Sequence, residues 1–370
     1  MKERAERTAR ASAVEHTGGE APRLLAVRTA VPPHVLEQRD VERRVHAQFS
    51  SHALVQRLLP VFANTGIERR HSCVPVEWYY DAHGWRERNQ RYLESASALL
   101  EECAAHALDA AGLHPRDIGT LMTVSTSGIA TPSLEARLME RMPFSRTVRR
   151  IPLFGLGCAG GALGLGYAAD AARADPERAV LLLDVELCTL WFRRDEITKS
   201  NIVATALFAD GAAAAVLACN GEGPRIIAHG SYTFPASLDV MGWEVADDGL
   251  QALFSQDIPH LVRTRMREIC SEFLSEHGLE RTRIDTYLCH PGGAKVLDAL
   301  EEVFGLAPGA LEDSRAVLRE YGNMSSATVL FVLESAVRRG AFAPNTGPCA
   351  LLTALGPGFT AGFAVLDFDA

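Results

Sequence analysis

The sequence contains no C-x-x-C pair and no grouping of cysteine and histidine with the spacing of a zinc site. Its eight cysteines are scattered over 370 residues, at Cys73, Cys103, Cys158, Cys188, Cys219, Cys270, Cys289 and Cys349. This pattern predicts neither a disulfide network nor a structural metal. Free thiols in a reducing cytoplasm are the simplest interpretation for seven of them, whereas Cys158 has a different setting.

An excess of basic residues is also missing. Lys and Arg number 37 against 46 Asp and Glu, which leaves a formal net charge of −9 and a pI near 5.8. This balance argues against nucleic acid as a partner, although local arginine clusters can still bind an anionic small substrate. A hydrophobic content of 47% and a charged content of 22% are typical of a globular protein, and the length suits two fused units.

A secretory signal and a membrane span are not predicted either. Residues 1–22 are charged and alanine-rich without an apolar core, so we expect a flexible N-terminal arm and a cytoplasmic protein. The stretch Ile151–Ala169 carries no charge over 19 residues, which is long enough to span a bilayer. Because it contains Pro152 and six glycines, we expect a buried helix entered through a tight turn instead.

Strand-like apolar runs alternate with helical patterns, which indicates an α/β fold. The clearest predicted strands are Thr120–Val124, Ala179–Val185, Thr286–Cys289 and Pro348–Leu355. The clearest predicted helices are Leu93–Ala111, Pro259–His277 and Ser326–Arg338.

The chain also repeats itself. Five residues recur with the same identity 166 positions later: Leu108, Gly112, Leu113, Ile118 and Thr120 match Leu274, Gly278, Leu279, Ile284 and Thr286. At an offset of 165, Cys158–Ala162 aligns with Asn323–Ala327, and each is followed by a helix and an apolar strand. A third pair ends the halves, with Ala206-Leu207 and Ala215–Leu217 against Ala354-Leu355 and Ala364–Leu366.

The repeat predicts two similar halves, residues 23–222 and 223–370, related by a pseudo-two-fold axis. In both halves a glycine suits the C-terminus of the preceding helix. Cys158 and Asn323 hold equivalent places at the starts of central helices, which can converge at the junction of the halves, where ligand sites are common.

Cys158 follows the apolar run Ile151–Phe154 and a glycine-rich turn, a pattern of strand, turn and helix. A thiol at a helix N-terminus faces unpaired N–H groups and the positive end of the helix dipole, which favours the thiolate with pKa values of roughly 3.5–7.5. We therefore expect a nucleophile. The alternative is a buried structural cysteine.

The same glycines suggest a rival class of enzyme. Gly155-x-Gly157-x-x-Gly160 matches the dinucleotide fingerprint, and Asp184 ends the next strand, as in NAD-dependent oxidoreductases. The motif lies in mid-chain, however, behind an earlier α/β layer. Its counterpart in the repeat, Asn323-Met-Ser-Ser326, is no phosphate-binding loop.

Two further residues suit a thioester chemistry. His290 ends a strand and precedes a glycine turn, although an ordinary loop histidine is an alternative. Asn323 stands opposite Cys158 in the repeat, with a helix N-cap as its alternative role. A thiolate can accept an acyl group, imidazole can stabilise that thiolate, and His and Asn N–H groups can stabilise an enolate oxygen. The set suits decarboxylation of a malonyl thioester followed by carbon–carbon bond formation.

From about Pro22 onward the chain resembles type III polyketide synthases, the chalcone-synthase-like branch of the thiolase superfamily. The resemblance rests on Gly157-Cys158, Ala206-Leu-Phe-Ala-Asp-Gly-Ala212, His290-Pro-Gly-Gly293, Gly322-Asn-Met-Ser-Ser326 and Gly356-Pro-Gly358. It implies a thiolase fold of duplicated αβαβα halves in five layers, a homodimer, CoA thioester substrates, and no metal or redox cofactor. A β-ketoacyl-ACP synthase III-like ketosynthase is the close alternative.

The resemblance also implies roles for individual residues. Cys158 carries the acyl chain, and His290 and Asn323 bind the malonyl thioester during decarboxylation. Phe208 forms an aromatic gate, with a core phenylalanine as the alternative. The residues expected to line the cavity are Thr131, Trp191 and Ser325.

Plant members carry basic residues for CoA around positions equivalent to 57–64, where this chain keeps Arg57 but has Pro60 and Asn64. We therefore expect Arg57 and Lys295 to bind CoA. The alternative is that an acyl carrier protein delivers the starter. Arg69 and Arg70 are further candidates, with a solvated charge pair as the alternative.

Other segments resemble the bacterial alkylresorcinol and alkylpyrone synthases, which take fatty acyl starters. They are Phe62–Arg70, Ser127–Ser133, Gly155–Gly161 and Asp239–Trp243. Small residues beside Cys158 favour a roomy cavity, whereas Trp191 and Trp243 favour a narrower one.

Overall fold

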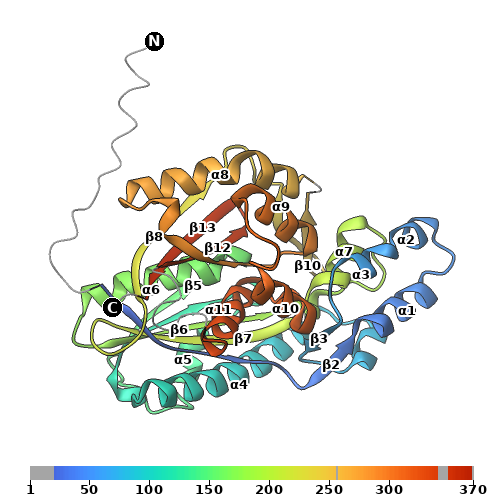
Figure 1. Cartoon of the computed structure of the whole chain (residues 1–370). Helices are drawn as coiled ribbons and strands as arrows, with labels where there is room; N and C mark the ends of the chain where they lie inside the picture. Colours follow the sequence, from blue (N-terminus) through green and yellow to red (C-terminus); the bar gives the residue numbers. More distant parts are fainter. Residues whose placement is uncertain (1–20, 256, 341–348, 369–370) are drawn as a thin grey trace, which may run out of the picture.

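The computed structural model describes residues 21–255, 257–340 and 349–368, so most of the arm predicted over 1–22 lies outside the described residues. The chain forms five layers: outer helices, a sheet, a central pair of helices, a second sheet and further outer helices (Figure 1). The two similar halves confirm the internal repeat, and the five layers confirm the fold that the resemblance implied.

The first sheet has the strand order β5-β4-β6-β7-β1. Its strands are β1 (Arg23–Ala30), β4 (Ile118–Val124), β5 (Arg149–Leu153), β6 (Ala179–Leu187) and β7 (Asp210–Ala218). The strand β4 runs parallel to β5 and β6, and β7 runs antiparallel to β6 and β1. All side chains of β4, β6 and β7 are buried, because helices cover both faces of the sheet.

The second sheet has the order β11-β12-β13-β8. Its strands are β8 (Arg225–Thr233), β11 (Ile284–Cys289), β12 (Cys349–Gly356) and β13 (Thr360–Asp367). Here β11 and β12 are parallel while β12, β13 and β8 are antiparallel, which repeats the pattern of β4, β6, β7 and β1. One residue pair, Arg23 with Arg225, joins the two sheets into a continuous ladder of nine strands.

The central layer consists of α6 (Gly160–Ala174) and α11 (Thr328–Arg338), whose side chains form one apolar core with both sheets. The segment Ile151–Ala169 thus contains a strand, a turn and a buried helix, as predicted. Small residues let these helices approach closely. A Cβ on Gly161 would lie 2.3 Å from the carbonyl oxygen of Ser326, so no larger residue fits there.

The outer layers are α4 (Trp85–Ala111) on the first sheet and α8 (Ile258–Glu276) with α9 (Ala294–Phe304) on the second. Gly112 and Gly278 both take φ +66° where the helices end, as the repeat predicted. The helix α4 begins eight residues before the predicted Leu93. A 3₁₀ turn, η6 (Ser325–Ala327), precedes α11 because Ser325 has φ +49°, which no α-helix accepts. Pro348, predicted to start a strand, lies outside the described residues.

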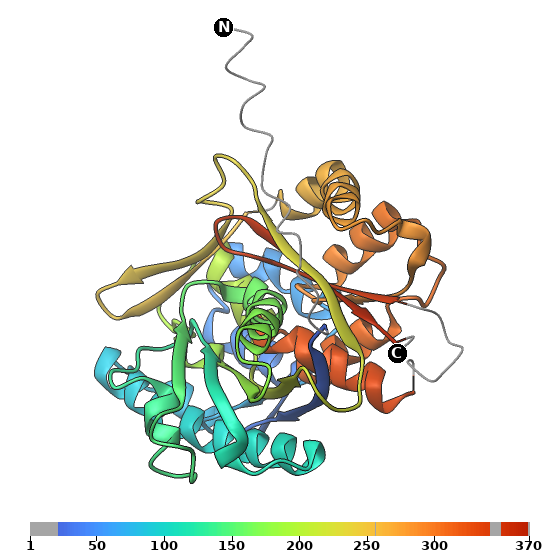
Figure 2. The same cartoon turned by 90° about the vertical axis from the view of Figure 1, so that its left-hand side faces the viewer.

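Among the remaining elements, α1, α2, α3 and α7 lie side by side at one end of the layers (Figure 1). The helices are α1 (Gln38–Gln48), α2 (Ala53–Leu58), α3 (Pro60–Asn64), α5 (Leu134–Leu138), α7 (Lys199–Leu207) and α10 (Glu312–Tyr321). The short strands are β2 (His34–Glu37), β3 (Arg69–Ser72), β9 (Met241–Ala246) and β10 (Gly249–Phe254). The β9–β10 hairpin projects from the side of the molecule (Figure 2). Within the described residues, no helix is long and apolar enough to cross a membrane.

Candidate active site

Cys158 lies in a 3₁₀ turn, η3 (Gly157–Ala159), between β5 and α6, and its side chain is buried. Gly157 has φ +47°, and a Cβ there would lie 2.5 Å from Cδ of Pro357 in the turn between β12 and β13. The backbone N–H of Gly157 donates to Oγ1 of Thr126. The glycine and this hydrogen bond together hold the turn that presents the thiol.

His290 directly follows β11 and is 4% exposed. Its backbone N–H donates to the carbonyl of Thr353 in β12, which fixes the backbone. Neither ring nitrogen has a hydrogen-bond partner within residues 21–255, 257–340 and 349–368. Buried polar atoms are rarely left unpaired, so both nitrogens are available for a substrate.

Asn323 is held on both sides by backbone hydrogen bonds. Its N–H donates to Leu207 O, and its carbonyl accepts from the N–H of Ala209. Its Oδ1 accepts from the N–H of Ser325, and its Nδ2 donates to Gly292 O at 3.4 Å. One Nδ2 hydrogen therefore remains for another acceptor. The Oγ of Ser325 in turn lies 3.6 Å from Sγ of Cys158, so the starts of the two central helices meet at the thiol.

Cys158, His290 and Asn323 line one cavity of about 490 Å³, which we call the active-site cavity. The structure thus brings together the three residues that the sequence singled out from separate segments. Other lining residues come from α2 and α3 on one side and from β12 and α9 on the other. Among them are Arg57, Val61, Asn64, Phe254, Lys295 and Leu355.

The electrostatics of the thiol differ from the expectation. Burial raises the pKa of Cys158 to about 12, the hydrogen bond between Cys158 and Ser325 lowers it, and the charge of Glu186 raises it further. The predicted stabilisation of a thiolate by the helix N-terminus is therefore outweighed by desolvation. Burial also lowers the pKa of His290 to about 3. Both shifts favour the neutral forms, a thiol at Cys158 and an unprotonated imidazole at His290.

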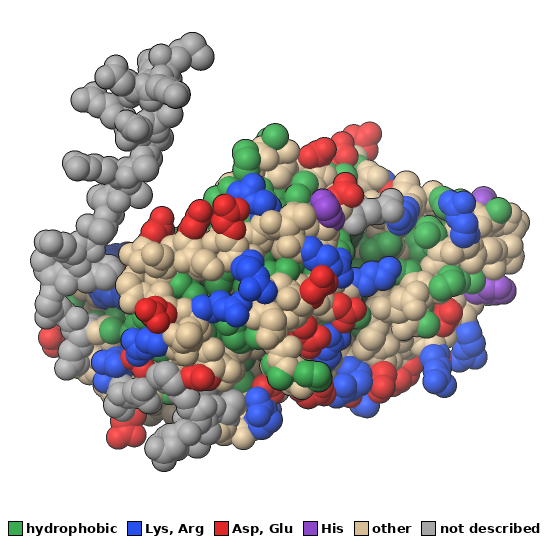
Figure 3. All heavy atoms as spheres, turned by 45° about the horizontal axis from the view of Figure 1, so that its top comes forward, with side chains coloured by type: hydrophobic (Ala, Val, Ile, Leu, Met, Phe, Trp, Pro, Cys, Tyr) green, Lys and Arg blue, Asp and Glu red, His purple; other side chains and the backbone are tan. Residues whose placement is uncertain are grey.

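Basic side chains stand at the mouth of this cavity. Arg57 from α2, Lys199 from α7 and Lys295 from α9 all line it. Figure 3 looks onto the face that carries α8. It shows a hollow lined by apolar side chains, with Lys and Arg side chains around it. Of the three basic residues that line the cavity, Lys199 was missed by the sequence reasoning, because no local motif marks it.

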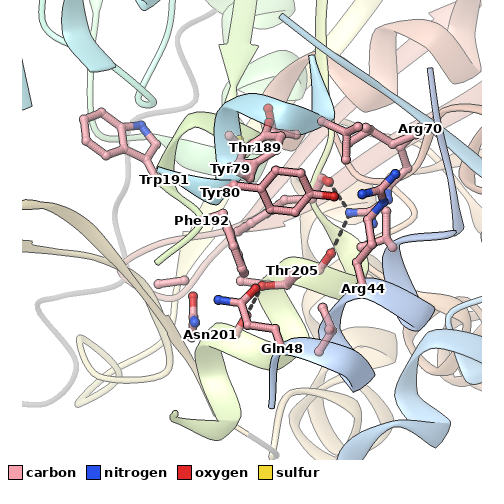
Figure 4. A pocket seen from close by; sticks show the side chains of 18 of the residues that line it. Arg44, Gln48, Arg70, Tyr79, Tyr80, Thr189, Trp191, Phe192, Asn201 and Thr205 are labelled. Atoms are coloured by element: carbon pink, nitrogen blue, oxygen red, sulfur yellow. Dashed lines mark hydrogen bonds between the residues drawn. The ribbon is translucent and has the colours of Figure 1, made fainter. Parts of the chain in front are cut away.

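A smaller cavity of about 80 Å³, the distal chamber, lies beyond an aromatic wall. The wall consists of Phe208, stacked on Trp243 at 5.3 Å and packed against Phe254 at 5.5 Å. Phe254 faces the active-site cavity, whereas Phe208 and Trp243 line the distal chamber. The chamber continues between η1 (Val76–Tyr80), α7 and α1, whose Arg44 and Gln48 stand opposite Tyr80 (Figure 4).

Several predicted site residues fall elsewhere. Trp191 lines the distal chamber, and its Nε1 donates to Ser127 O. Thr131 is exposed on the loop between β4 and α5 and lines neither of these two cavities of the single chain. Arg70 is not part of a solvated pair: it is 2% exposed and donates to the carbonyls of Thr205 and Phe208. Arg69 pairs with Glu320 at 3.1 Å.

The structure also removes the dinucleotide interpretation. Asp184 points into the central layer, is fully buried and lies 2.6 Å from Oγ of Ser326, so it cannot reach a ribose outside the sheet. Next to it, Glu186 is also fully buried. The sequence reasoning missed this pair of carboxyls. Their spacing of two residues on one strand was the available signal, because alternate residues share a face.

Sequence profiles of known families match nearly the whole chain. Residues 8–221 match the N-terminal domain of chalcone and stilbene synthases, and residues 227–367 match their C-terminal domain. The chain is 40% identical over 353 residues to a 1,3,6,8-tetrahydroxynaphthalene synthase of Streptomyces peucetius subsp. caesius, covering 93% of this chain and 92% of that protein. It is 37% identical over 362 residues to a putative chalcone synthase of Bacillus subtilis, covering 94% and 98%.

Among solved structures, the fold matches that of 1,3,6,8-tetrahydroxynaphthalene synthase from Streptomyces coelicolor A3(2), a bacterial type III polyketide synthase. The TM-score is 0.90 at 32% identity, over 94% of this chain and 99% of that one. The named relatives do not include an alkylresorcinol or alkylpyrone synthase, so the comparisons support the family and leave the finer assignment open.

Proposed function

Because the chain belongs to the chalcone and stilbene synthase family and is a type III polyketide synthase that condenses malonyl-CoA by decarboxylation, we propose that it extends a fatty acyl starter carried on Cys158. One observation carries this proposal. The active-site cavity contains a buried thiol, an imidazole with both nitrogens unpaired and an amide with a free N–H.

In the loading step, Sγ of Cys158 attacks the thioester carbonyl of the starter. The raised pKa of the thiol makes a resting thiolate rare, so a base must take the proton as the carbon–sulfur bond forms. The neutral imidazole of His290 has one nitrogen free to accept that proton. The proton then passes to the departing CoA thiolate, which leaves the acyl group on Cys158 and free CoA thiol.

In the extension step, the carbon–carbon bond to the malonyl carboxylate breaks and CO₂ leaves. The electron pair passes to an enolate whose oxygen accepts hydrogen bonds from a ring N–H of His290 and from Nδ2 of Asn323. The enolate carbon attacks the acyl carbonyl on Cys158, the carbon–sulfur bond breaks, and the released thiolate takes up one proton from solvent. No redox step and no metal is required by this balance.

The distal chamber is the feature that supports the proposal of a fatty acyl starter. Its walls are mostly apolar, it lies beyond the aromatic wall of Phe208, and each methylene buried there stabilises the complex by about 0.8 kcal/mol. In the proposed pose, an acyl tail on Cys158 passes this wall toward α1. Arg57, Lys199 and Lys295 suit the phosphates of CoA, with an acyl carrier protein as the alternative donor. We also propose a homodimer in the cytoplasm, in keeping with eight free cysteines.

A second candidate is favoured by the relatives. Their names point to a hydroxynaphthalene product, for which the distal chamber would hold the growing polyketide and not an alkyl tail. The fatty acyl proposal allows two products, which differ in how the ring closes. An aldol condensation yields an alkylresorcinol, and lactonisation yields an alkylpyrone.

The deciding experiment incubates the purified protein with malonyl-CoA, alone and with acyl-CoA starters from short to long chain. Mass spectrometry then follows the products and the peptide that contains Cys158. Alkylated pyrones or resorcinols and a long-chain acyl mass on that peptide would support the proposal. A naphthalene product from malonyl-CoA alone, with no long-chain acylation, would favour the second candidate.

A further inference from the structure

A single hydroxyl group sits between two buried carboxyls behind the nucleophile. The Oγ of Ser326 lies 2.6 Å from Oδ1 of Asp184 and 2.9 Å from Oε1 of Glu186. A serine hydroxyl has one hydrogen and can donate to only one of them. If both carboxyls were ionised, the other contact would bring two acceptors together with no hydrogen between them. One of the two carboxyls must therefore carry a proton and donate it to Oγ.

The surroundings show which carboxyl is neutral. Glu186 accepts hydrogen bonds from the backbone N–H groups of Thr126 and Ser127, which favour its ionised form. Among the residues that the structure describes, none donates an N–H to Asp184, and its Oδ2 has no hydrogen-bond partner. Burial raises the pKa of Asp184 well above its usual range, and the charge of Glu186 raises it further. Burial also raises the pKa of Glu186, but hydrogen bonds from three residues, Thr126, Ser127 and Ser326, oppose that effect.

No cation compensates the pair. Within the described part of the chain, neither carboxyl has an ion pair or a hydrogen bond with Lys, Arg or His. The titratable groups within electrostatic reach of the two carboxyls are themselves neutral or acidic. They are Tyr92 and Cys103 from α4, Cys158 from η3 and Cys188 from η4 (Cys188–Trp191). In such a setting the second negative charge is much more costly than the first.

The pair is close to the reacting thiol. Thr126, whose N–H binds Glu186, accepts through Oγ1 from the N–H of Gly157, the residue before Cys158. Ser326 follows Ser325, whose hydroxyl lies against Sγ of Cys158. Negative charge on Glu186 raises the pKa of Cys158, after the larger effect of burial. The number of charges on the pair thus bears directly on how readily Cys158 loses its proton.

We propose that Asp184 and Glu186 share one proton through Ser326, with Asp184 as the neutral acid, and that the pair is a positioning element that limits the negative charge behind Cys158 to one. In this arrangement Asp184 donates to Ser326, and Ser326 donates to Glu186. The hydrogen bonds join β6 to the start of α11, and so hold the two halves in register at the nucleophile. The inference rests on the proposed role of Cys158 as acyl carrier.

The test compares two isosteric variants, D184N and E186Q, by the pH dependence of Cys158 alkylation with iodoacetamide. The mass of the Cys158 peptide separates this thiol from the other seven. D184N replaces a neutral acid by a neutral amide, so the alkylation midpoint should stay where it is in the wild type. E186Q removes the one charge, so its midpoint should fall by about one pH unit, which corresponds to about a tenfold gain in thiolate at fixed pH. A fall in D184N as large as in E186Q would show an ionised Asp184 and overturn the proposal, and so would an unchanged midpoint in E186Q.

Infrared spectroscopy gives a second readout. At pH 7 the wild type should show the C=O stretch of a neutral, non-hydrated carboxyl that disappears in D184N, and in D184S if the amide fails to fold. Absence of that difference would contradict the neutral Asp184. The proposed function fails separately: if no acyl thioester acylates Cys158 while its alkylation responds to the variants as expected, the acyl-carrier role is wrong and the shared proton stands.

Discussion

The hydroxyl of Ser325 lies 3.6 Å from the thiol of Cys158, although 167 residues separate them in the chain. Each belongs to the turn that begins one of the two central helices. This contact places the nucleophile of one half against the asparagine loop of the other, and most of the chemistry proposed for this enzyme depends on that junction.

Removal of each of the three central side chains should separate two steps. Cys158→Ala should abolish starter loading, seen as loss of the acyl mass on the protein. His290→Ala and Asn323→Ala should slow release of CO₂ from malonyl-CoA, by about 10²–10³-fold for loss of one enolate donor. Full-length polyketide from Cys158→Ala would contradict the assignment of the nucleophile.

Ser325→Ala should make Cys158 less acidic. The hydrogen bond between Ser325 and Cys158 lowers the pKa of the thiol, so its loss should slow alkylation at pH 8 several-fold, consistent with about 1 kcal/mol for a buried hydrogen bond. Ser335→Ala, on the same central helix but bonded to Asp313, is the control and should alkylate like the wild type. Faster alkylation of Ser325→Ala would count against the contact.

Gly157→Ala should destabilise the nucleophile turn. Its positive φ costs an alanine about 1–2 kcal/mol, and the clash of the new Cβ with Pro357 adds about 1–3 kcal/mol. Gly155→Ala is a matched control, because Gly155 also has positive φ (+87°) but a Cβ there meets nothing within 4 Å. The free energy of unfolding measured in urea should therefore be lower for Gly157→Ala than for Gly155→Ala. Equal values would show that the turn shifts and relieves the clash.

Ala204→Phe should shorten the longest accepted starter. Ala204 lies on α7 and lines the distal chamber, so a phenyl ring there fills space proposed for the acyl tail. The ratio of kcat/KM for long and short acyl-CoA starters should fall at least tenfold, with short starters little affected. Ala110→Phe, on the exposed side of α4, is the control for an added ring. An unaltered chain-length profile would place the tail elsewhere.

Asp184→Asn should change how stability depends on pH. A carboxyl whose pKa is raised on folding binds its proton more tightly in the native state, so its contribution is complete below its usual pKa of 3.8 and is lost as pH rises toward the folded pKa. Relative to wild type, the amide variant should therefore gain stability as pH rises, by at most about 1.4 kcal/mol per pH unit. Urea unfolding between pH 4 and 8 measures this, with the exposed Asp109→Asn as control. A difference that shrinks with rising pH would reverse the sign and refute the neutral acid.

Much of this protein follows from the sequence by itself. The recurrence of Leu108–Thr120 as Leu274–Thr286 predicted the duplicated halves, because a repeated fold keeps its helix-ending glycines and buried strands. The glycine turn around Cys158 and the strand end at His290 are local patterns, which neighbouring residues determine. These features identified the three residues that line the active-site cavity.

Other features were decided only by the tertiary structure. The position of Cys158 at a helix start suggested an acidic thiol, yet burial among residues distant in the chain raises its pKa. The glycine pattern before α6 made Asp184 a candidate ribose ligand, but the structure places Ser326, 142 residues away in the chain, beside it. Arg70, for which a solvated charge pair was one alternative, is likewise buried. Desolvation and long-range contacts depend on which segments pack together, and a local pattern carries no record of that packing.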